Sequence, residues 1–282
     1  KSALRYTPFG NTLTLQFAEA AVNGENLGNG NSTDFLTINC ASTDYQGHLT
    51  GPNSIETEDV YLRLDNDLAN FFSYLDKKVG KGNYLVFLTA DHGGAHAEGF
   101  MEKYKMPTSF KPELKITLNN ELKSEFSFGP LILSFENDEI YFDNIKIEQQ
   151  HLDKDKIIKS TLAIVKKLPG VLYVVEQSDA MNTSIPKRIR EMIINGYTRG
   201  RSGEIKIIWK SGILPGNDKT GTTHGLWNPY DTHIPLLWMG WKVPHGETNQ
   251  TVFMTDISAT LAALLHIQMP SGCIGDPITS LT

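Results

Sequence analysis

The sequence has few cysteines, no long apolar run and no cluster of basic residues, and each absence excludes a class of protein. Two cysteines among 282 residues, Cys40 and Cys273, exclude a small scaffold held together by many disulfides. Because no run of about 18 consecutive apolar residues occurs, we expect no insertion into a membrane. A net charge of −6 without any Lys/Arg-rich run argues against a nucleic acid partner.

What the sequence does contain is typical of a globular protein. Hydrophobic residues make up 40% of the chain and charged residues 21%, which is enough to bury a sizeable core. The chain opens on KSALRYTPFGN, without an initiator methionine or a signal-peptide pattern. We therefore expect that it begins inside a longer protein, whose amino-terminal segment is missing here and could also exist as a separate chain.

The first hundred residues predict a strand, a helix and a second strand. DFLTINC (34–40) and NYLVFLTA (83–90) are short apolar runs bounded by polar residues, as buried strands are. Between them, 56–80 carries apolar residues at steps of three and four, with acids in the first turn and two lysines and a glycine at the end. Strand, helix, strand in this order predicts a parallel sheet with a right-handed crossover.

From about residue 101 to 203 the pattern changes to short antiparallel strands, predicted in ELKITLNN and in PLILSFENDEIYFDNIKIE, where ENDE is the hairpin turn. A helix around DKIIKSTLAIVKKLPG and a strand in VLYVVEQ follow. Beyond 203 we predict strands in GEIKIIWK and HIPLLWMGW and a helix in MTDISATLAALLHI capped by Thr255 or Asp256. The fold class is α/β: a mainly parallel sheet flanked by helices, with 1–100 and 204–282 forming the core and 101–203 an inserted α+β subdomain.

Three groups of polar residues follow the predicted strands. Asp44 and His48 come after the first strand, Asp91 and His92 directly after the second, and His224 lies in a glycine-flanked loop between two later strands. An Asp-His pair at a strand end is more often a solvated loop or a helix cap than a metal ligand. In open parallel sheets, however, ligands bind at the carboxyl ends of the strands, so we expect the three groups to meet at one rim.

Carboxylates and imidazoles together suit zinc or a similar metal. Asp44, His48 and His224 supply three ligands and leave one coordination position open, as catalytic zinc sites do. Asp91 and His92 supply only two ligands, which is too few for a second catalytic ion. The residues therefore predict one nearly complete site and one incomplete site.

The stretches LTINCASTDYQGHLTGPNSIETEDVYLRLD, VFLTADHGG and KTGTTHGLWNPYDTHIPLLWMGW together resemble the alkaline phosphatase superfamily, most closely the single-chain bacterial alkaline phosphatases of the PafA type. The resemblance implies two zinc ions per complete enzyme. One is held by Asp44, His48 and His224. The other is held by Asp91 and His92 together with an aspartate and the nucleophilic threonine from an upstream segment, so no catalytic residue is expected within this chain.

The resemblance also implies hydrolysis of small phosphate monoesters, by phosphoryl transfer to the threonine and then hydrolysis, in the periplasm or outside the cell. Two alternatives stay open. A phosphodiesterase or nucleotide pyrophosphatase of the same superfamily shares all five ligands. The chain by itself is expected to be inactive, and it could be a catalytically incomplete metal-binding fragment.

Four further residues have candidate roles near these motifs. His233 is a candidate for orienting a ligand from behind, or for a histidine that simply begins a strand. Arg201, Lys219 and Thr222 offer basic and hydroxyl groups, but a surface or loop-structuring role is favoured for all three.

Overall fold

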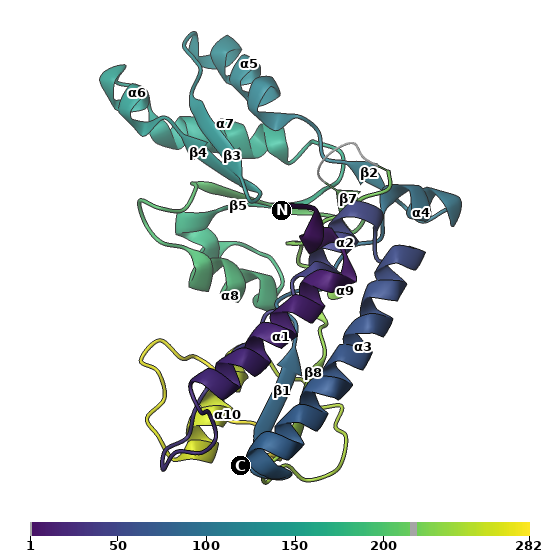
Figure 1. Cartoon of the computed structure of the whole chain (residues 1–282). Helices are drawn as coiled ribbons and strands as arrows, with labels where there is room; N and C mark the ends of the chain where they lie inside the picture. Colours follow the sequence, from purple (N-terminus) through teal and green to yellow (C-terminus); the bar gives the residue numbers. More distant parts are fainter. Residues whose placement is uncertain (1, 215–218) are drawn as a thin grey trace. The chain divides into compact units, whose positions relative to one another are not determined.

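The computed structural model describes residues 2–214 and 219–282, which form two compact units (Figure 1). The first unit comprises Lys1–Gln46, Ile55–Gly93 and His233–Thr282, and the second comprises Gly47–Ser54 and Gly94–Thr232. The predicted division of the chain at residues 101 and 203 stays a prediction.

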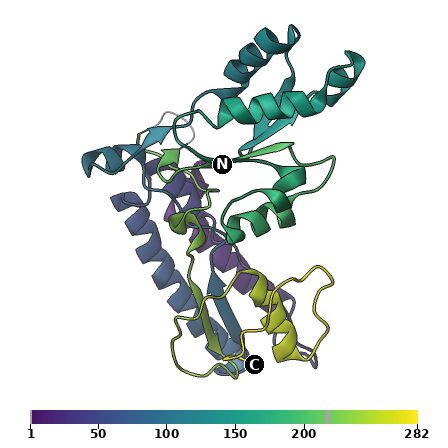
Figure 2. The same ribbon diagram turned by 180° about the vertical axis from the view of Figure 1, so that it is seen from behind.

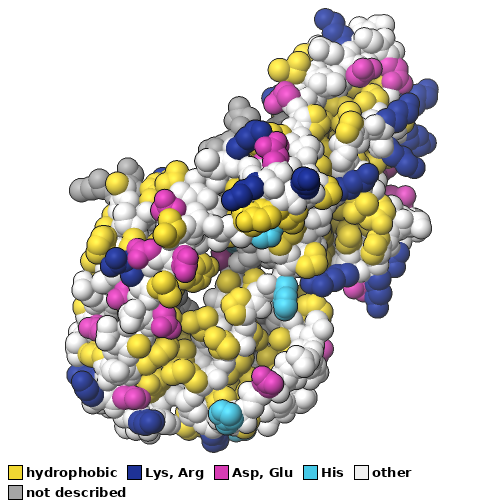
Figure 3. Space-filling model, turned by 90° about the vertical axis from the view of Figure 1, so that its right-hand side faces the viewer, with side chains coloured by type: hydrophobic (Ala, Val, Ile, Leu, Met, Phe, Trp, Pro, Cys, Tyr) yellow, Lys and Arg dark blue, Asp and Glu magenta, His cyan; other side chains and the backbone are white. Residues whose placement is uncertain are grey.

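The first unit is built around a two-stranded ribbon. Strand β1 (Leu85–Thr89) pairs antiparallel with β8 (Leu236–Gly240), in a register that places Leu85 opposite Gly240 and Thr89 opposite Leu236. Helices α1 (Pro8–Gly24) and α3 (Ile55–Leu75) lie in front of the ribbon in Figure 1, and α10 (Thr255–Leu265) is in front in the reverse view of Figure 2. The helices cover the ribbon only in part, since Leu237 and Met239 of β8 are exposed. In the space-filling view of Figure 3, hydrophobic side chains gather over a broad part of the surface.

The predicted helix over 56–80 is confirmed as α3, which continues into a short π-helical turn, Asp76–Gly80. Gly80 ends this turn with φ of 101°, a conformation that glycine adopts without strain. The buried face of α1, including Leu15 and Ala18, packs against Phe71 of α3 in a small core. The regular spacing of apolar residues thus placed this helix correctly.

A four-stranded antiparallel sheet in the order β3-β4-β6-β5 forms the centre of the second unit. The predicted hairpin is confirmed, because β3 and β4 pair antiparallel. Its two turn residues, Asn137 and Asp138, have φ of 51° and 63°, as the turn of a two-residue hairpin requires. The sheet is formed by β3 (Ile132–Glu136), β4 (Glu139–Phe142), β5 (Val171–Glu176) and β6 (Ile205–Trp209).

Helices and a second, smaller sheet complete this unit. The large core includes Leu122, Ile140 and Trp209, which are almost fully buried. The helices are α4 (Glu98–Lys103), α5 (Leu114–Phe126), α6 (Asn144–Gln149), α7 (Lys154–Val165), α8 (Lys187–Gly196) and α9 (Pro229–Thr232). Strands β2 (Ser109–Phe110) and β7 (Ile213–Leu214) pair in parallel.

Strand pairing in the described residues differs from the prediction. Of the observed pairs only β2 with β7 is parallel, while the ribbon and the four-stranded sheet are antiparallel. The segment 34–40, predicted as a buried strand, is not a strand and is mostly exposed. With no neighbouring strand to pair with among the described residues, it forms no ladder of hydrogen bonds.

Three other local predictions were wrong. ELKITLNN lies in helix α5, because Leu114, Leu118 and Leu122 repeat every four residues and are buried on one face. NIKIE, predicted to continue the second strand of the hairpin, forms helix α6 instead. The Asp143 carboxylate caps the first turn of this helix by accepting a hydrogen bond from the Lys146 N–H. Helix α10 has Met254 as its N-cap, although the Asp256 carboxylate accepts from the Phe253 N–H.

The remaining predicted elements are confirmed as α7, β5, β6, β8 and α10. Among the described helices, none combines the length and apolar character needed to cross a membrane.

Candidate metal centre

Asp44 and His48, which the sequence places just after segment 34–40, lie on helix α2 (Ser42–Thr50). Residues four apart on a helix face the same side, so the two side chains project from one face of α2. Where the helix starts, the Asn11 side-chain oxygen accepts a hydrogen bond from the Ser42 N–H at 3.0 Å. The sequence concealed this helix because its polar residues show no apolar periodicity.

A glycine ends α2 for a steric reason. Gly51 has φ of +79°, and a Cβ added there would lie 3.0 Å from the Ala97 Cβ and 3.2 Å from the Thr220 carbonyl oxygen. Only glycine combines this backbone conformation with so close an approach of the neighbouring chain. Gly51 therefore fixes the end of the helix turn that carries His48.

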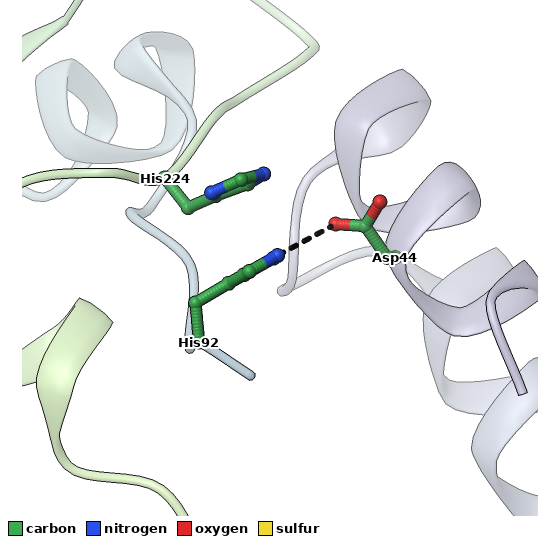
Figure 4. Close-up of side chains that lie close together, drawn as sticks. All are labelled: Asp44, His92 and His224. Carbon is green, nitrogen blue, oxygen red and sulfur yellow. Dashed lines mark ion pairs between the residues drawn. The ribbon is translucent and has the colours of Figure 1, made fainter. Parts of the chain in front are cut away.

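In the first unit, His92 follows strand β1 and faces two carboxylates. Its Nε2 lies 3.8 Å from Asp44 Oδ1 (Figure 4). The same atom lies 3.7 Å from Asp91 Oδ2. Its Nδ1 is 2.7 Å from the Gly93 carbonyl oxygen. A carbonyl can only accept, so Nδ1 carries the proton and, in a neutral ring, Nε2 carries the lone pair. His92 thus directs a metal-binding nitrogen toward Asp44 and Asp91.

In the second unit, His48 is held in the same way by the loop that carries His224. The His48 Nδ1 lies 2.9 Å from the Thr222 carbonyl oxygen, and the Thr222 N–H donates to the His48 carbonyl at 3.1 Å. These two bonds join the end of α2 to the loop. The His48 and His224 rings lie 5.1 Å apart between centroids. Since a carbonyl only accepts, the His48 Nδ1 again carries a proton, and in a neutral ring the lone pair is on Nε2.

Backbone and side-chain hydrogen bonds fix the loop that bears His224. The Ala95 N–H donates to the Thr223 carbonyl at 3.2 Å, immediately before His224. Just after it, the buried Asp231 carboxylate accepts from the Leu226 N–H at 2.6 Å. Because both flanks are tied down, the position of His224 is set by the fold of the second unit.

These donors fit a zinc ion. Zinc binds nitrogen and oxygen at about 2.0–2.2 Å, which places two donors of a tetrahedral site roughly 3.3–3.5 Å apart. The distance of 3.7 Å from His92 Nε2 to the Asp91 carboxylate is too long for a good hydrogen bond, yet close to this separation. Helix α2 supplies one donor to each pair, Asp44 beside His92 and His48 beside His224. The chemistry of the set, two carboxylates and three imidazoles, is that of zinc proteins.

Two side chains with carboxylates close to them, Tyr61 and Lys219, have raised pKa values. Burial, and then the negative charge of Asp44, raises the pKa of the Tyr61 hydroxyl, which therefore stays protonated at neutral pH. Lys219 donates to Glu102 at 2.8 Å, and this hydrogen bond raises the pKa of the lysine. The ammonium of Lys219 is therefore paired with a carboxylate, in line with a loop-structuring role.

Two further histidines, His233 and His96, lie close in sequence to the candidate ligands His224 and His92. His233 is exposed and precedes β8, and its role behind a ligand stays a prediction. His96 is half-buried, with its Nδ1 2.6 Å from the Asn53 side-chain oxygen and its ring stacked on Phe100. The carbonyls of Gly93 and Thr222 were missed, because any residue type offers a carbonyl and no sequence signal marks those that orient a histidine.

Comparison with known proteins finds a matching protein family and several similar proteins. A family model described as type I phosphodiesterase / nucleotide pyrophosphatase matches residues 5–233. The alkaline phosphatase PafA of Elizabethkingia meningoseptica is 53% identical over 282 residues, which are 100% of this chain and 52% of that protein. The alkaline phosphatase PhoV of Synechococcus elongatus is 47% identical over 285 residues, covering 99% of this chain and 50% of that protein.

The solved structure of one of these relatives has the same fold as this chain. The crystal structure of wild-type alkaline phosphatase PafA superposes with a TM-score of 0.96 at 53% identity, over 99% of this chain and 53% of that chain. The chain therefore spans about half the length of the relatives it matches.

Proposed function

The chain belongs to the type I phosphodiesterase / nucleotide pyrophosphatase family, and from this premise we propose that it carries most of the zinc ligands of a phosphate monoester hydrolase. Its fold is alkaline-phosphatase-like, as the match to PafA shows. The observation that carries the proposal is the pair of histidines, His48 and His92, whose Nδ1 atoms are each held by a backbone carbonyl. A hydrogen bond from the other ring nitrogen to a carbonyl holds a zinc-binding histidine in the correct tautomer.

We assign Asp44, His48 and His224 to one zinc ion and Asp91 and His92 to a second. The second ion needs further ligands, among them the nucleophilic threonine, which we place outside these residues. When bound, two zinc ions lower the pKa of a coordinated hydroxyl and stabilise the attacking and leaving oxygens of a phosphoryl transfer.

The chain's own residues have three tasks in this proposal. The carboxylates of Asp44 and Asp91 would balance the positive charge of the two zinc ions. The Nδ1–H groups of His48 and His92 donate to the carbonyls of Thr222 and Gly93, so that both rings keep their orientation through turnover. Gly51 and Thr222 hold the end of α2 and the His224 loop together.

The names of the relatives favour one of the two hydrolase classes. PafA and PhoV are both called alkaline phosphatases, which favours monoesters, whereas the family description also includes phosphodiesterases. We therefore propose small phosphate monoesters as substrates and keep diester hydrolysis as the second candidate. A periplasmic or secreted location belongs to the same proposal.

Substrate preference tests the proposal. The combined enzyme is defined here as this chain joined to the half of PafA that it does not match. We expect it to hydrolyse p-nitrophenyl phosphate faster than bis-p-nitrophenyl phosphate in the presence of zinc. The 282-residue chain alone should hydrolyse neither, because the nucleophile is outside it.

Two outcomes would contradict this. Faster hydrolysis of the diester would establish the second candidate function instead. Turnover of either substrate by the chain alone, at a rate proportional to its concentration after repeated purification, would place the nucleophile among these residues.

A further inference from the structure

Helix α2, which carries Asp44, has no capping side chain of its own at its start. The Tyr45 N–H donates to the Ala41 carbonyl at 3.1 Å, so Ala41 occupies the N-cap position. A Ser, Thr, Asp or Asn side chain at this position usually accepts from one of the first N–H groups of a helix, but alanine has no acceptor. Because Ser42 is only 4% exposed, another part of the chain has to accept from its N–H in place of water.

Asn11 of α1 supplies this acceptor from 31 positions earlier in the sequence. Its side-chain oxygen accepts from the Ser42 N–H at 3.0 Å, and Asn11 is itself only 1% exposed. The NH₂ group of the same side chain has no hydrogen-bond partner among the described residues. Asn11 therefore contributes to this contact through its oxygen.

Two poor helix formers stand where α1 meets α2. Helix α1 begins with PFGN, although glycine and asparagine both rank low in helix propensity. A Cβ added at Gly10 would overlap with the Ser42 hydroxyl oxygen. Gly10 thus lets the two helices approach closely, and Asn11 provides the hydrogen bond between them.

Helix α1 is in turn fixed to α3. The Thr12 hydroxyl donates to the Asp67 carboxylate at 2.6 Å, and the Tyr74 hydroxyl donates to the Glu19 carbonyl at 3.2 Å. Apolar side chains of both helices also pack together in a small core. A continuous series of contacts therefore leads from α3, through α1 and Asn11, to the first residue of α2.

Asp44 is the third residue of α2, two positions after Ser42, and it projects from the helix toward His92 (Figure 4). Helix ends fray first, so a loose first turn would move the Asp44 carboxylate. We propose that Asn11 is a positioning residue, which caps α2 from α1 and thereby holds Asp44 in place for zinc. Asn11 supplies no metal ligand and acts through Ser42. This inference rests on the proposed function, because it takes Asp44 as a zinc ligand.

Zinc binding by the combined enzyme, measured without substrate, tests this role. Asn11→Leu keeps the approximate size of the side chain and removes the acceptor. It should weaken the binding of one zinc ion by at least about tenfold and leave the other within about threefold, since loss of a residue that supports a ligand lowers metal affinity by about 10–100-fold. Competition with a chromogenic chelator measures both dissociation constants.

Two matched variants separate positioning from a general effect on stability. Asn11→Asp keeps the acceptor oxygen, and aspartate is as good an N-cap as asparagine, so both ions should bind within about threefold of wild type. Val22→Ala is the control, because Val22 is 2% exposed near the other end of α1. It should lower the melting temperature and leave zinc binding unchanged. A purely structural role of Asn11 would make Asn11→Leu and Val22→Ala behave alike.

Hydrogen exchange of the combined enzyme gives a second readout, in the presence of a chelator. The amide hydrogens of Ser42 and Tyr45 should exchange at least about tenfold faster in Asn11→Leu than in wild type, because the first turn of α2 loses its cap. Asn11→Asp and Val22→Ala should not show this change. If Asn11→Leu does not fold, Asn11→Ala removes the acceptor without adding bulk, and the same results are expected of it.

Equal zinc affinities in wild type and Asn11→Leu would overturn the proposal, as would unchanged exchange at Ser42. It is also overturned if Asn11→Asp does not restore zinc binding, or if Val22→Ala weakens zinc binding as much as Asn11→Leu does. The proposed function would instead fail in the wild type. A preference for the diester would leave these results untouched, and an enzyme that binds no zinc would overturn both.

Discussion

His224→Ala in the combined enzyme is expected to empty one of the two zinc sites and to lower the hydrolysis of p-nitrophenyl phosphate. The assigned site then retains only Asp44 and His48, and two ligands are too few for a catalytic zinc. Removal of a residue that only hydrogen-bonds to a metal ligand already lowers metal affinity or activity by about 10–100-fold. Removal of a ligand itself should therefore lower activity by at least about 100-fold. Zinc content by elemental analysis and initial rates measure the two effects.

His245→Ala is the matched control, because His245 is an exposed histidine of the same chain. It should leave both zinc ions and the rate unchanged. If His224→Ala retains full zinc content and activity, His224 is not a ligand and the assignment is wrong. A loss of both ions at once would show that the two sites do not fill independently.

Asp138→Ala is expected to lower the free energy of unfolding of the chain by about 3–5 kcal/mol, as the removal of one partner from a buried ion pair does. The Asp138 carboxylate accepts from Lys111 Nζ at 2.6 Å and from the Trp209 indole N–H at 2.9 Å. The Asp138 and Lys111 side chains are only 11% and 13% exposed. Without the carboxylate, a buried ammonium and a buried N–H lose their acceptor. Urea unfolding followed by tryptophan fluorescence measures the change.

Two further variants separate the causes. Glu191→Ala removes an exposed ion pair with Lys187 and should change stability by less than about 1 kcal/mol. Asp138→Asn keeps an acceptor and tolerates the positive φ of this turn, so its loss should be smaller than that of Asp138→Ala. Equal effects of Asp138→Ala and Glu191→Ala would show that the buried pair contributes no more than a surface pair.

Apolar periodicity carried enough information to predict α3, the β3–β4 hairpin and α7, because each buries a regular face or turns at residues that favour positive φ. It failed where periodicity is short or depends on distant partners. Helix α5 was missed because its buried leucines extend beyond the eight residues that resemble a strand. Segment 34–40 has the composition of a strand, but a strand also requires a neighbour to pair with.

At the candidate metal centre, the sequence alone singles out the candidate ligands, whose role as ligands stays a prediction, whereas the contacts that support them are not visible in it. Asp44, His48, Asp91, His92 and His224 stand out as acids and histidines in short motifs. Backbone carbonyls orient the rings of His48 and His92, and the helix that carries Asp44 has no apolar periodicity. These features arise only when the chain is folded.

Anomalous diffraction at the zinc absorption edge, from crystals of the combined enzyme grown with zinc, tests the central claim most directly. Two peaks are predicted, one about 2.0–2.1 Å from Nε2 of His92 and one at the same distance from Nε2 of His48, with a nitrogen of His224 bound to the second. Peaks at the Nδ1 atoms, or zinc ions bound only elsewhere on the chain, would contradict the account.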